Sequence, residues 1–127
     1  MKILVVDDDP GILNAFRVNL ISFGYRVLTT SNGQDALDIL DTNQQLDDPV
    51  DILVSDLRMN GMSGNDLIYK SRIKHTNLKA VLMTAYGNDA VIRQVRNMGC
   101  AYLDKPFSPE KLMDILNCLN VNMYSAS

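Results

Sequence analysis

The stretch Ile3–Pro10 reads Ile-Leu-Val-Val-Asp-Asp-Asp-Pro, and it decides the fold expected for this chain. Four apolar residues are followed at once by three carboxylates and a proline. A short apolar run that ends in turn-forming residues is typical of a buried strand. A proline directly after aspartate is a common start of a helix. The segment therefore predicts a strand over Ile3–Val6 that leads into a helix beginning at Pro10.

The acidic run Asp7, Asp8 and Asp9 has two interpretations. Adjacent carboxylates repel one another and need a cation, a basic side chain or deep solvation to stay ionised together. A hard cation such as Mg²⁺ takes oxygen ligands from one or two carboxylates. Alternatively, Asp8 or Asp9 caps the helix and the other acids only favour its dipole. The acidic run by itself leaves both interpretations open.

Length and composition indicate one globular domain. The chain has 127 residues, of which 46% are hydrophobic and 21% are charged, as in a folded domain with a single core. Its net charge of -3 offers no basic surface for nucleic acid. The N-terminal residues match neither a signal peptide nor a membrane span. We expect a cytoplasmic protein that does not bind nucleic acid directly or enter a membrane.

The two cysteines and the single histidine predict no metal or redox site of their own. Cys100 and Cys118 form no Cys-x-x-Cys pair and are predicted to be small core residues. His75 lies in the polar setting Lys-His-Thr-Asn, which predicts a surface position near a helix end.

Short apolar runs alternate with stretches of helical period, as expected of a parallel sheet covered by helices. The predicted strands are Ile3–Val6, Arg26–Thr30, Asp51–Ser55, Ala80–Thr84 and Ala101–Asp104. The first, third and fourth are almost continuously Val, Ile, Leu and Met, which suits central strands buried on both faces. The order is (βα)₅, an α/β fold.

Five helices have recognisable boundaries. The first begins at Pro10 and stops at Gly24, the second is capped by Ser31 or Asn32, the third follows Gly64, the fourth opens at Asn88 or Asp89 and ends at Gly99, and the fifth starts at Ser108-Pro109-Glu110. Residues 120–127 are small and polar. We therefore expect a domain over 1–120 and, over 121–127, a frayed tail or the start of a linker.

Polar residues gather at the predicted strand ends. Asp7 and Asp8 follow the first strand, Asp56 the third, Thr84 with Ala85 the fourth, and Lys105 with Pro106 the fifth. In an open parallel sheet, ligands bind outside the carboxyl ends of the strands. We therefore expect these residues to share one rim.

That set matches the requirements of phosphoryl transfer, which are a metal, a cation and a hydroxyl around the phosphoryl group. The carboxylates can hold Mg²⁺, and Asp56 is also able to act as a nucleophile that forms an acyl phosphate. Lys105 supplies the cation and Thr84 the hydroxyl. The alternative is that Lys105 is a surface lysine before a turn and that Thr84 bonds a neighbouring backbone group.

Five separated motifs closely resemble the receiver domain of two-component response regulators. They are Ile3–Pro10, Val54–Met59, Gly61–Gly64, Met83–Gly87 and Tyr102–Phe107. The resemblance implies a CheY-like fold, that is, a doubly wound, flavodoxin-like five-stranded parallel sheet with strand order 2-1-3-4-5. The sequence around Asp56 and Thr84 is most similar to that of receivers of NtrC-type transcriptional activators.

By this resemblance Asp56 would be the phosphoacceptor, receiving the group from a phosphohistidine on a sensor histidine kinase or a histidine phosphotransfer protein. Asp8 and Asp56 would bind Mg²⁺ directly, the backbone carbonyl of Arg58 would complete the protein ligands, and Asp7 would act through a bound water. Asp9 would have no role beyond the acidic helix start. The protein would be a signalling phosphoacceptor rather than an enzyme, with only self-phosphorylation and slow autodephosphorylation.

The resemblance also implies a switch. Lys105, held by its bond to Pro106, would pair with the phosphoryl group, Thr84 with Ala85 would approach it, and Tyr102 would turn inward. The face formed by the fourth helix, fifth strand and fifth helix would then change its preference for an effector domain, a target protein or a second copy of the chain.

The chain departs from the family pattern at two places. Asn60 stands where the family usually has proline, which implies a less rigid loop after Asp56. The spacing from Gly99 to Lys105 is one residue shorter than usual, which implies a tighter loop before the fifth strand.

Two large residues lie two positions beyond key site residues, Arg58 after Asp56 and Tyr86 after Thr84. Their size predicts that they cover the acyl phosphate and slow its hydrolysis.

Three other functions fit the sequence less well. A phosphohydrolase of the haloacid dehalogenase type would have Thr or Val where Gly11 stands, and the chain has no room for a substrate-selecting cap. A pseudo-receiver that only binds partners would lack one of the acidic or lysine positions, and all are present. Neither a Gly-x-Gly-x-x-Gly nor a Walker A sequence supports nucleotide binding.

Overall fold

A computed structural model of the chain describes residues 1–125, with side chains described up to Leu119. Strands and helices alternate without exception along this part of the chain. They are β1 Lys2–Val6, α1 Pro10–Ser22, β2 Arg26–Thr30, α2 Gly33–Gln45, β3 Ile52–Asp56, α3 Gly64–Lys74, β4 Lys79–Thr84, α4 Asp89–Asn97, β5 Ala101–Asp104 and α5 Pro109–Ser125. The predicted (βα)₅ order is confirmed.

The strands form one parallel sheet in the order β2-β1-β3-β4-β5. Strands β1 and β3 are buried along their whole length and β4 along all but its first residue. They are the central strands that the continuous apolar runs predicted. Because all strands point the same way, their carboxyl ends lie at one edge of the sheet, which is where ligands bind in this class of fold.

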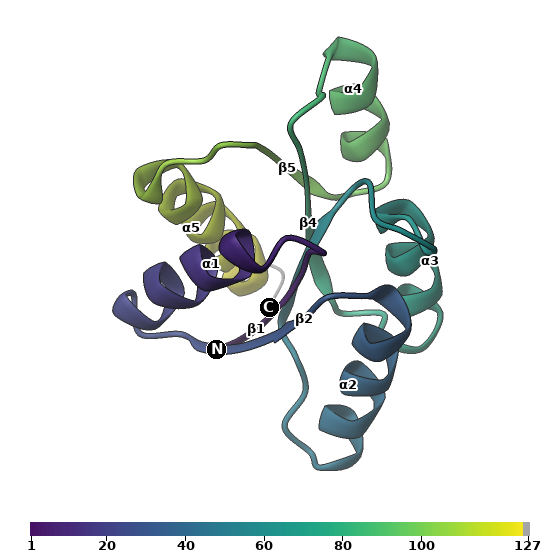
Figure 1. Cartoon of the computed structure of the whole chain (residues 1–127). Coiled ribbons are helices and arrows are strands. Elements are labelled where there is room, and N and C mark those ends of the chain that lie inside the picture. The colour runs from purple at the N-terminus through teal and green to yellow at the C-terminus, as the bar shows by residue number, and fades with distance from the viewer. Residues whose placement is uncertain (126–127) are drawn as a thin grey trace.

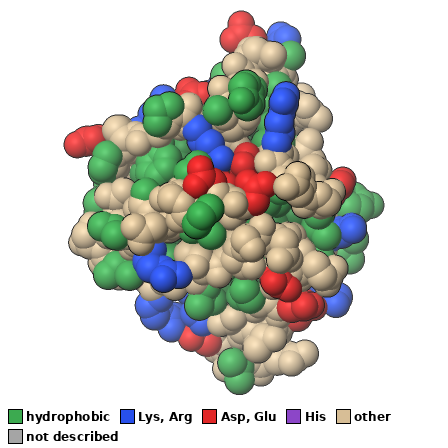
Figure 2. Space-filling model, viewed as in Figure 1, with side chains coloured by type: hydrophobic (Ala, Val, Ile, Leu, Met, Phe, Trp, Pro, Cys, Tyr) green, Lys and Arg blue, Asp and Glu red, His purple; other side chains and the backbone are tan. Residues whose placement is uncertain are grey.

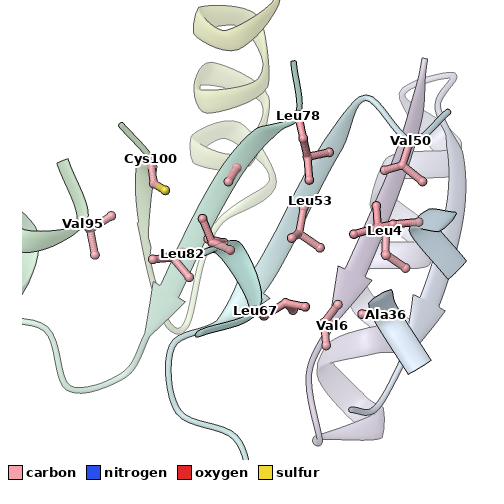
Figure 3. Close-up of a cluster of buried hydrophobic side chains, with 13 residues drawn as sticks. Leu4, Val6, Ala36, Val50, Leu53, Leu67, Leu78, Leu82, Val95 and Cys100 are labelled. Atoms are coloured by element: carbon pink, nitrogen blue, oxygen red, sulfur yellow. The ribbon is translucent and has the colours of Figure 1, made fainter. Parts of the chain in front are cut away.

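Helices cover both faces of the sheet (Figure 1), α1 and α5 on one side and α2, α3 and α4 on the other. Alternate strand residues point to opposite faces, so the core is divided in two. Leu4 and Leu53 pack toward α2 and α3 (Figure 3), whereas Ile3 and Val54 pack with Phe16 of α1 on the other side. The sheet is thereby held rigidly between two apolar layers.

Polar caps start the first four helices. Asp9, Asn32 and Asn88 are caps that the sequence had offered, whereas Ser63, the cap of α3, had not been singled out. Asp9, Asn32, Ser63 and Asn88 each accept a hydrogen bond from a backbone N–H of the first turn, which satisfies a donor that the helix itself leaves free. The Asp9 carboxylate accepts from the Gly11 N–H at 2.9 Å. Asp9 is therefore the capping residue of the acidic run.

Some predicted boundaries were displaced. Asp56 is the last residue of β3 rather than the residue after it, and β3 starts at Ile52 instead of Asp51. Helix α5 continues to Ser125, so the backbone of the segment predicted as a tail is helical over most of its length. The division into a domain over 1–120 and a tail over 121–127 stays a prediction, and residues 126–127 lie outside the described part.

Two predictions about single residues were only partly right. His75 lies at the C-cap of α3, near a helix end as predicted, but its side chain is only 11% exposed, and its Nε2 lies 3.0 Å from Oδ1 of Asp41 on α2. Cys100 is buried as predicted, but Cys118 is exposed on α5. The partner that decides the environment of His75 thus lies on another helix.

Within the described residues, no helix has both the length and the apolar character needed to span a membrane.

Candidate functional site

The carboxyl ends of β1, β3 and β5 bring two carboxylates and one ammonium group together. The Lys105 Nζ lies 2.7 Å from Oδ2 of Asp7 and 2.9 Å from Oδ2 of Asp56. Figure 2 shows the resulting group of acidic side chains at the centre of this face, with basic side chains beside it. All three residues are largely buried, and their side chains are 13%, 1% and 9% exposed for Lys105, Asp7 and Asp56. Lys105 is therefore a bridging cation and not a surface lysine.

Backbone N–H groups hold the other oxygen of each carboxylate. The Asp9 N–H donates to Oδ1 of Asp7 at 2.8 Å, and the Arg58 N–H donates to Oδ1 of Asp56 at 3.1 Å. Each donor belongs to the loop that immediately follows its strand. Both carboxylates are thus oriented before any ligand binds, which is the arrangement that preorganised sites require.

Burial and charge act in opposite directions on the site. Burial raises the pKa of Asp7, although the hydrogen bond from Lys105 and that from the Asp9 N–H partly offset it. Burial disfavours the charged form of Lys105 too, but hydrogen bonds to Asp7 and Asp56 and their negative charges outweigh this and raise its pKa. The lysine is therefore positively charged at neutral pH.

Asp7, Asp8 and Asp56 form the metal-binding candidate of the described residues. Each offers one carboxylate oxygen, and these oxygens all lie within 4.8 Å of one another. Asp8 is exposed, whereas the other two are buried. An all-oxygen set that opens to solvent on one side fits a hard divalent cation that keeps several of its water ligands. The acidic run thus divides by role, with Asp7 and Asp8 at this cluster and Asp9 at the helix cap.

Thr84 is the last residue of β4, and Ala85 begins the loop between β4 and α4. The Thr84 hydroxyl is buried and accepts a hydrogen bond from the Tyr86 N–H at 3.1 Å, which is the local bond considered as the alternative from the sequence. Ala85 is exposed. The Lys105 N–H donates to the Thr84 carbonyl at 3.0 Å, so this loop and the site lysine are tied together through the backbone.

Arg58 and Tyr86, the two large residues beyond Asp56 and Thr84, contact each other. The Arg58 Cζ lies 5.2 Å from the centre of the Tyr86 ring, within the range of a cation–π interaction. Both residues are exposed, Tyr86 to 70%. Their contact joins the loop after β3 to the loop after β4.

Tyr102 and Pro106 complete the predicted set. The Tyr102 hydroxyl donates to Oδ1 of Asp104 at 2.6 Å, and the ring packs beside the core on the α4 side of the sheet. The Lys105–Pro106 peptide bond is cis.

Sequence reasoning missed two glycines that allow close approaches. A Cβ on Gly64 would lie 2.4 Å from the backbone oxygen of Asp56, and a Cβ on Gly87 would lie 1.6 Å from the Tyr102 hydroxyl. Neither has a positive φ, so neither is needed for a turn. Their position inside the quoted motifs was the only available signal, because the neighbours come from other segments.

Residues 3–117 match the family described as the response regulator receiver domain. Among curated relatives, the chain is 31% identical to the DNA-binding transcriptional regulator NtrC of Klebsiella pneumoniae, over 89% of this chain and 23% of that protein. It is 29% identical to the sporulation initiation phosphotransferase F of Bacillus subtilis, over 89% of this chain and 88% of that protein. Among solved structures, the chemotaxis protein CheY4 of Vibrio cholerae superposes with a TM-score of 0.83 at 26% identity, covering 93% and 97% of the two chains.

The relatives therefore differ in size. The chain spans about a quarter of the length of the transcriptional regulators it matches, whereas it covers most of the sporulation protein. The similarity to NtrC-type regulators agrees with the resemblance of the residues around Asp56 and Thr84 to that subfamily. The haloacid dehalogenase alternative receives no support from these matches.

Proposed function

Because this chain belongs to the receiver domain family of two-component response regulators, we propose that Asp56 accepts a phosphoryl group from a phosphohistidine on a sensor histidine kinase or a histidine phosphotransfer protein. One observation carries the assignment: the Asp56 carboxylate is buried at a strand end, with one oxygen on the Lys105 ammonium and the other on a backbone N–H. A carboxylate held in this way is oriented for in-line attack.

The transfer exchanges one bond for another. A carboxylate oxygen of Asp56 attacks the phosphorus, the bond between phosphorus and the histidine nitrogen breaks, and its electron pair returns to the imidazole, which takes up a proton. The product is an acyl phosphate on Asp56. Lys105, now 2.9 Å from the Asp56 carboxylate, neutralises charge on the transferred group, because phosphoryl transfer depends mainly on positioning and charge stabilisation.

We infer Mg²⁺ as the metal, on the basis of the oxygen cluster of Asp7, Asp8 and Asp56. When bound, Mg²⁺ supplies positive charge for the phosphoryl oxygens. Asp8, Asp56 and the Arg58 carbonyl would hold it directly, and Asp7 would hold it through a water. The Asp9 carboxylate is already committed to the helix cap.

The signal would leave the site through the loop after β4. The Thr84 hydroxyl would exchange the Tyr86 N–H for a phosphoryl oxygen, and the Ala85 N–H would add a second contact. Tyr102 and the face of α4, β5 and α5 would respond, and this face holds a groove of about 640 Å³. It would contact an effector domain, a target protein or, after phosphorylation, a second copy of the chain, in the cytoplasm.

Arg58 and Tyr86 would set the lifetime of the acyl phosphate, because their cation–π contact spans the two loops beside Asp56. We expect an Arg58→Ala, Tyr86→Ala variant to lose phosphate faster than the wild type, by less than about one order of magnitude, since each side chain shields the site without bonding it. The rate of phosphate loss after removal of the donor measures this. An unchanged half-life would contradict it.

Intact-protein mass spectrometry with acetyl phosphate and Mg²⁺ tests the acceptor. We expect the mass of one phosphoryl group on the wild type, none on Asp56→Asn, and the wild-type result on Asp114→Asn, a matched control on the exposed side of α5. A phosphoryl group that persists on Asp56→Asn would refute the assignment. Chelation of Mg²⁺ should abolish the modification, and retention of full labelling in chelator would remove the metal from the proposal.

A further inference from the structure

Tyr102 occupies space that is available only because residue 87 is glycine. A Cβ placed on Gly87 would lie 1.6 Å from the Tyr102 hydroxyl oxygen and 2.7 Å from the adjacent ring carbon. Gly87 does not have a positive φ, so its backbone conformation is open to any residue. The demand for glycine at this position therefore comes from the tyrosine on the neighbouring strand.

The Tyr102 hydroxyl is also held by a carboxylate. It donates to Oδ1 of Asp104 at 2.6 Å, and the two residues point to the same side of β5 because they are two positions apart. The other oxygen of Asp104 lies 3.9 Å from Nζ of Lys111 on α5. Burial, followed by the hydrogen bond and the charge of Asp104, raises the pKa of Tyr102 to about 12. A hydrogen bond to a charged acceptor is stronger than one between neutral groups.

Gly87 and Asp104, the two residues that hold Tyr102, are each connected to the phosphoacceptor site through a few backbone atoms. Gly87 follows Tyr86, whose N–H donates to the Thr84 hydroxyl. Asp104 precedes Lys105, whose N–H donates to the Thr84 carbonyl and whose Nζ contacts Asp56. A movement of the loop after β4 therefore changes the space above Gly87 and the geometry of the Tyr102–Asp104 hydrogen bond together.

We propose that Gly87 and Asp104 are positioning residues that hold Tyr102 across the loop after β4, and that the Tyr102–Asp104 hydrogen bond sets how readily Tyr102 leaves this position. The second part rests on the proposed function, because it assumes that the loop moves when Asp56 is modified. Weakening the bond should make Tyr102 respond at a lower degree of modification, since a two-state equilibrium shifts with the relative stability of its states.

The holding role can be tested on the unmodified protein without metal. Fluorotyrosine is incorporated, because its more acidic phenol titrates where the protein stays folded, and Tyr102→Phe identifies the Tyr102 signal in the ¹⁹F NMR spectrum. We expect Asp104→Asn to lower the pKa of this residue but to leave it above that of free fluorotyrosine, because burial remains. Asp114→Asn, an equivalent substitution on the same groove, should leave the pKa unchanged. Equal pKa values in the two variants would overturn the role of Asp104.

A double-mutant cycle tests Gly87. Gly87→Ala should lower the midpoint of thermal unfolding in the wild type and shift the Tyr102 signal. In a Tyr102→Ala background the same substitution should cost far less, because the conflicting ring is absent. Equal destabilisation in both backgrounds would overturn the role of Gly87, and this result is informative even if Gly87→Ala is poorly stable by itself.

The switching part is tested by titrating beryllofluoride with Mg²⁺ while recording the Tyr102 signal and the occupancy of Asp56. We expect the signal to move at lower occupancy in Asp104→Asn than in Asp114→Asn. If beryllofluoride occupies Asp56 but the Tyr102 signal moves in neither variant, the switching role is overturned and the proposed function still stands. Failure of beryllofluoride to occupy Asp56 would instead count against the proposed function, and the holding role would still be decided by the pKa and the double-mutant cycle.

Discussion

Replacing Lys105 with methionine should destabilise the protein strongly at neutral pH, because it leaves two buried carboxylates without their shared cation. Nζ of Lys105 lies 2.7 Å from Asp7 and 2.9 Å from Asp56, and all three side chains are less than one seventh exposed. Methionine keeps most of the apolar stem and removes only the charge. Removing one partner of a buried ion pair costs about 3–5 kcal/mol, which for a domain of this size lowers the unfolding midpoint on the order of 10 °C.

The loss of stability in Lys105→Met should depend on pH and on Mg²⁺. In Lys105→Met the Asp7 carboxyl group keeps the burial that already raises its pKa and loses the opposing cation, so its folded-state pKa lies further above the unfolded one. A raised folded-state pKa gives stability that is present at low pH and lost as the pH rises through it. The deficit should therefore shrink as the pH is lowered toward 4. Mg²⁺ should raise the free energy of unfolding of Lys105→Met above its value in chelator, since a ligand at 100 times its dissociation constant adds about 2.7 kcal/mol.

Urea unfolding followed by circular dichroism, in chelator and then in Mg²⁺, measures these free energies. Lys111→Met is the matched control: Lys111 and Asp104 are both more than half exposed and 3.9 Å apart, so its loss should cost less than about 1 kcal/mol. Adding Asp7→Asn to Lys105→Met should restore most of the stability by removing one of the two charges. A Lys105→Met protein as stable as the wild type at pH 7 in chelator, or no rescue by Asp7→Asn, would refute the reasoning.

Three further predictions test the core, a helix cap and an inter-helix pair. Phe16→Ala should lower the free energy of unfolding by about 3–5 kcal/mol, because Phe16 is fully buried, whereas Val18→Ala, at a side chain 61% exposed, should change it by no more than about 0.5 kcal/mol; similar losses would contradict the assigned core. Asp9→Ala should lower the free energy of unfolding by about 1 kcal/mol, because the helix cap is lost. It should leave the affinity for Mg²⁺ unchanged in a calorimetric titration, and loss of Mg²⁺ binding would place Asp9 in the metal site. The hydrogen bond between His75 and Asp41 holds the pKa of Asp41 below its usual value. This pair therefore stabilises the fold above pH 3.8, and its contribution is lost as the pH falls through the lowered pKa. His75→Ala should abolish that part of the acid dependence of unfolding, and an unchanged pH profile would be evidence against the pair.

Local features of the sequence were sufficient for the order of elements. The apolar runs that become β1, β3 and β4 are recognisable because strands buried on both faces need no polar alternation. Asp9 and Asn32 cap helices through bonds to residues two or three positions away, and such short-range chemistry can be read directly. The uncertain boundaries, such as Asp56 inside β3, depend on pairing with the next strand, which no local pattern records.

Single-residue environments were less predictable. His75 has polar neighbours in sequence and was expected at the surface, but Asp41 on α2 covers it. Gly87 resembled any loop glycine until the Tyr102 hydroxyl was found in the space of its missing side chain. Both depend on how one element packs against another, and packing is decided by the whole core and not by the residue and its neighbours.

The sequence by itself determined that this chain would fold as (βα)₅ and that Asp7, Asp8, Asp56, Thr84 and Lys105 would lie at one edge of the sheet, because parallel strands end at the same edge. Only the tertiary structure decided which atoms meet there. It placed Lys105 against Asp56, 49 positions earlier in the chain, and left Asp9 to cap a helix. The physical reason is that periodicity and capping act over a few residues, whereas ion pairs and close packing join segments that only the folded sheet brings together.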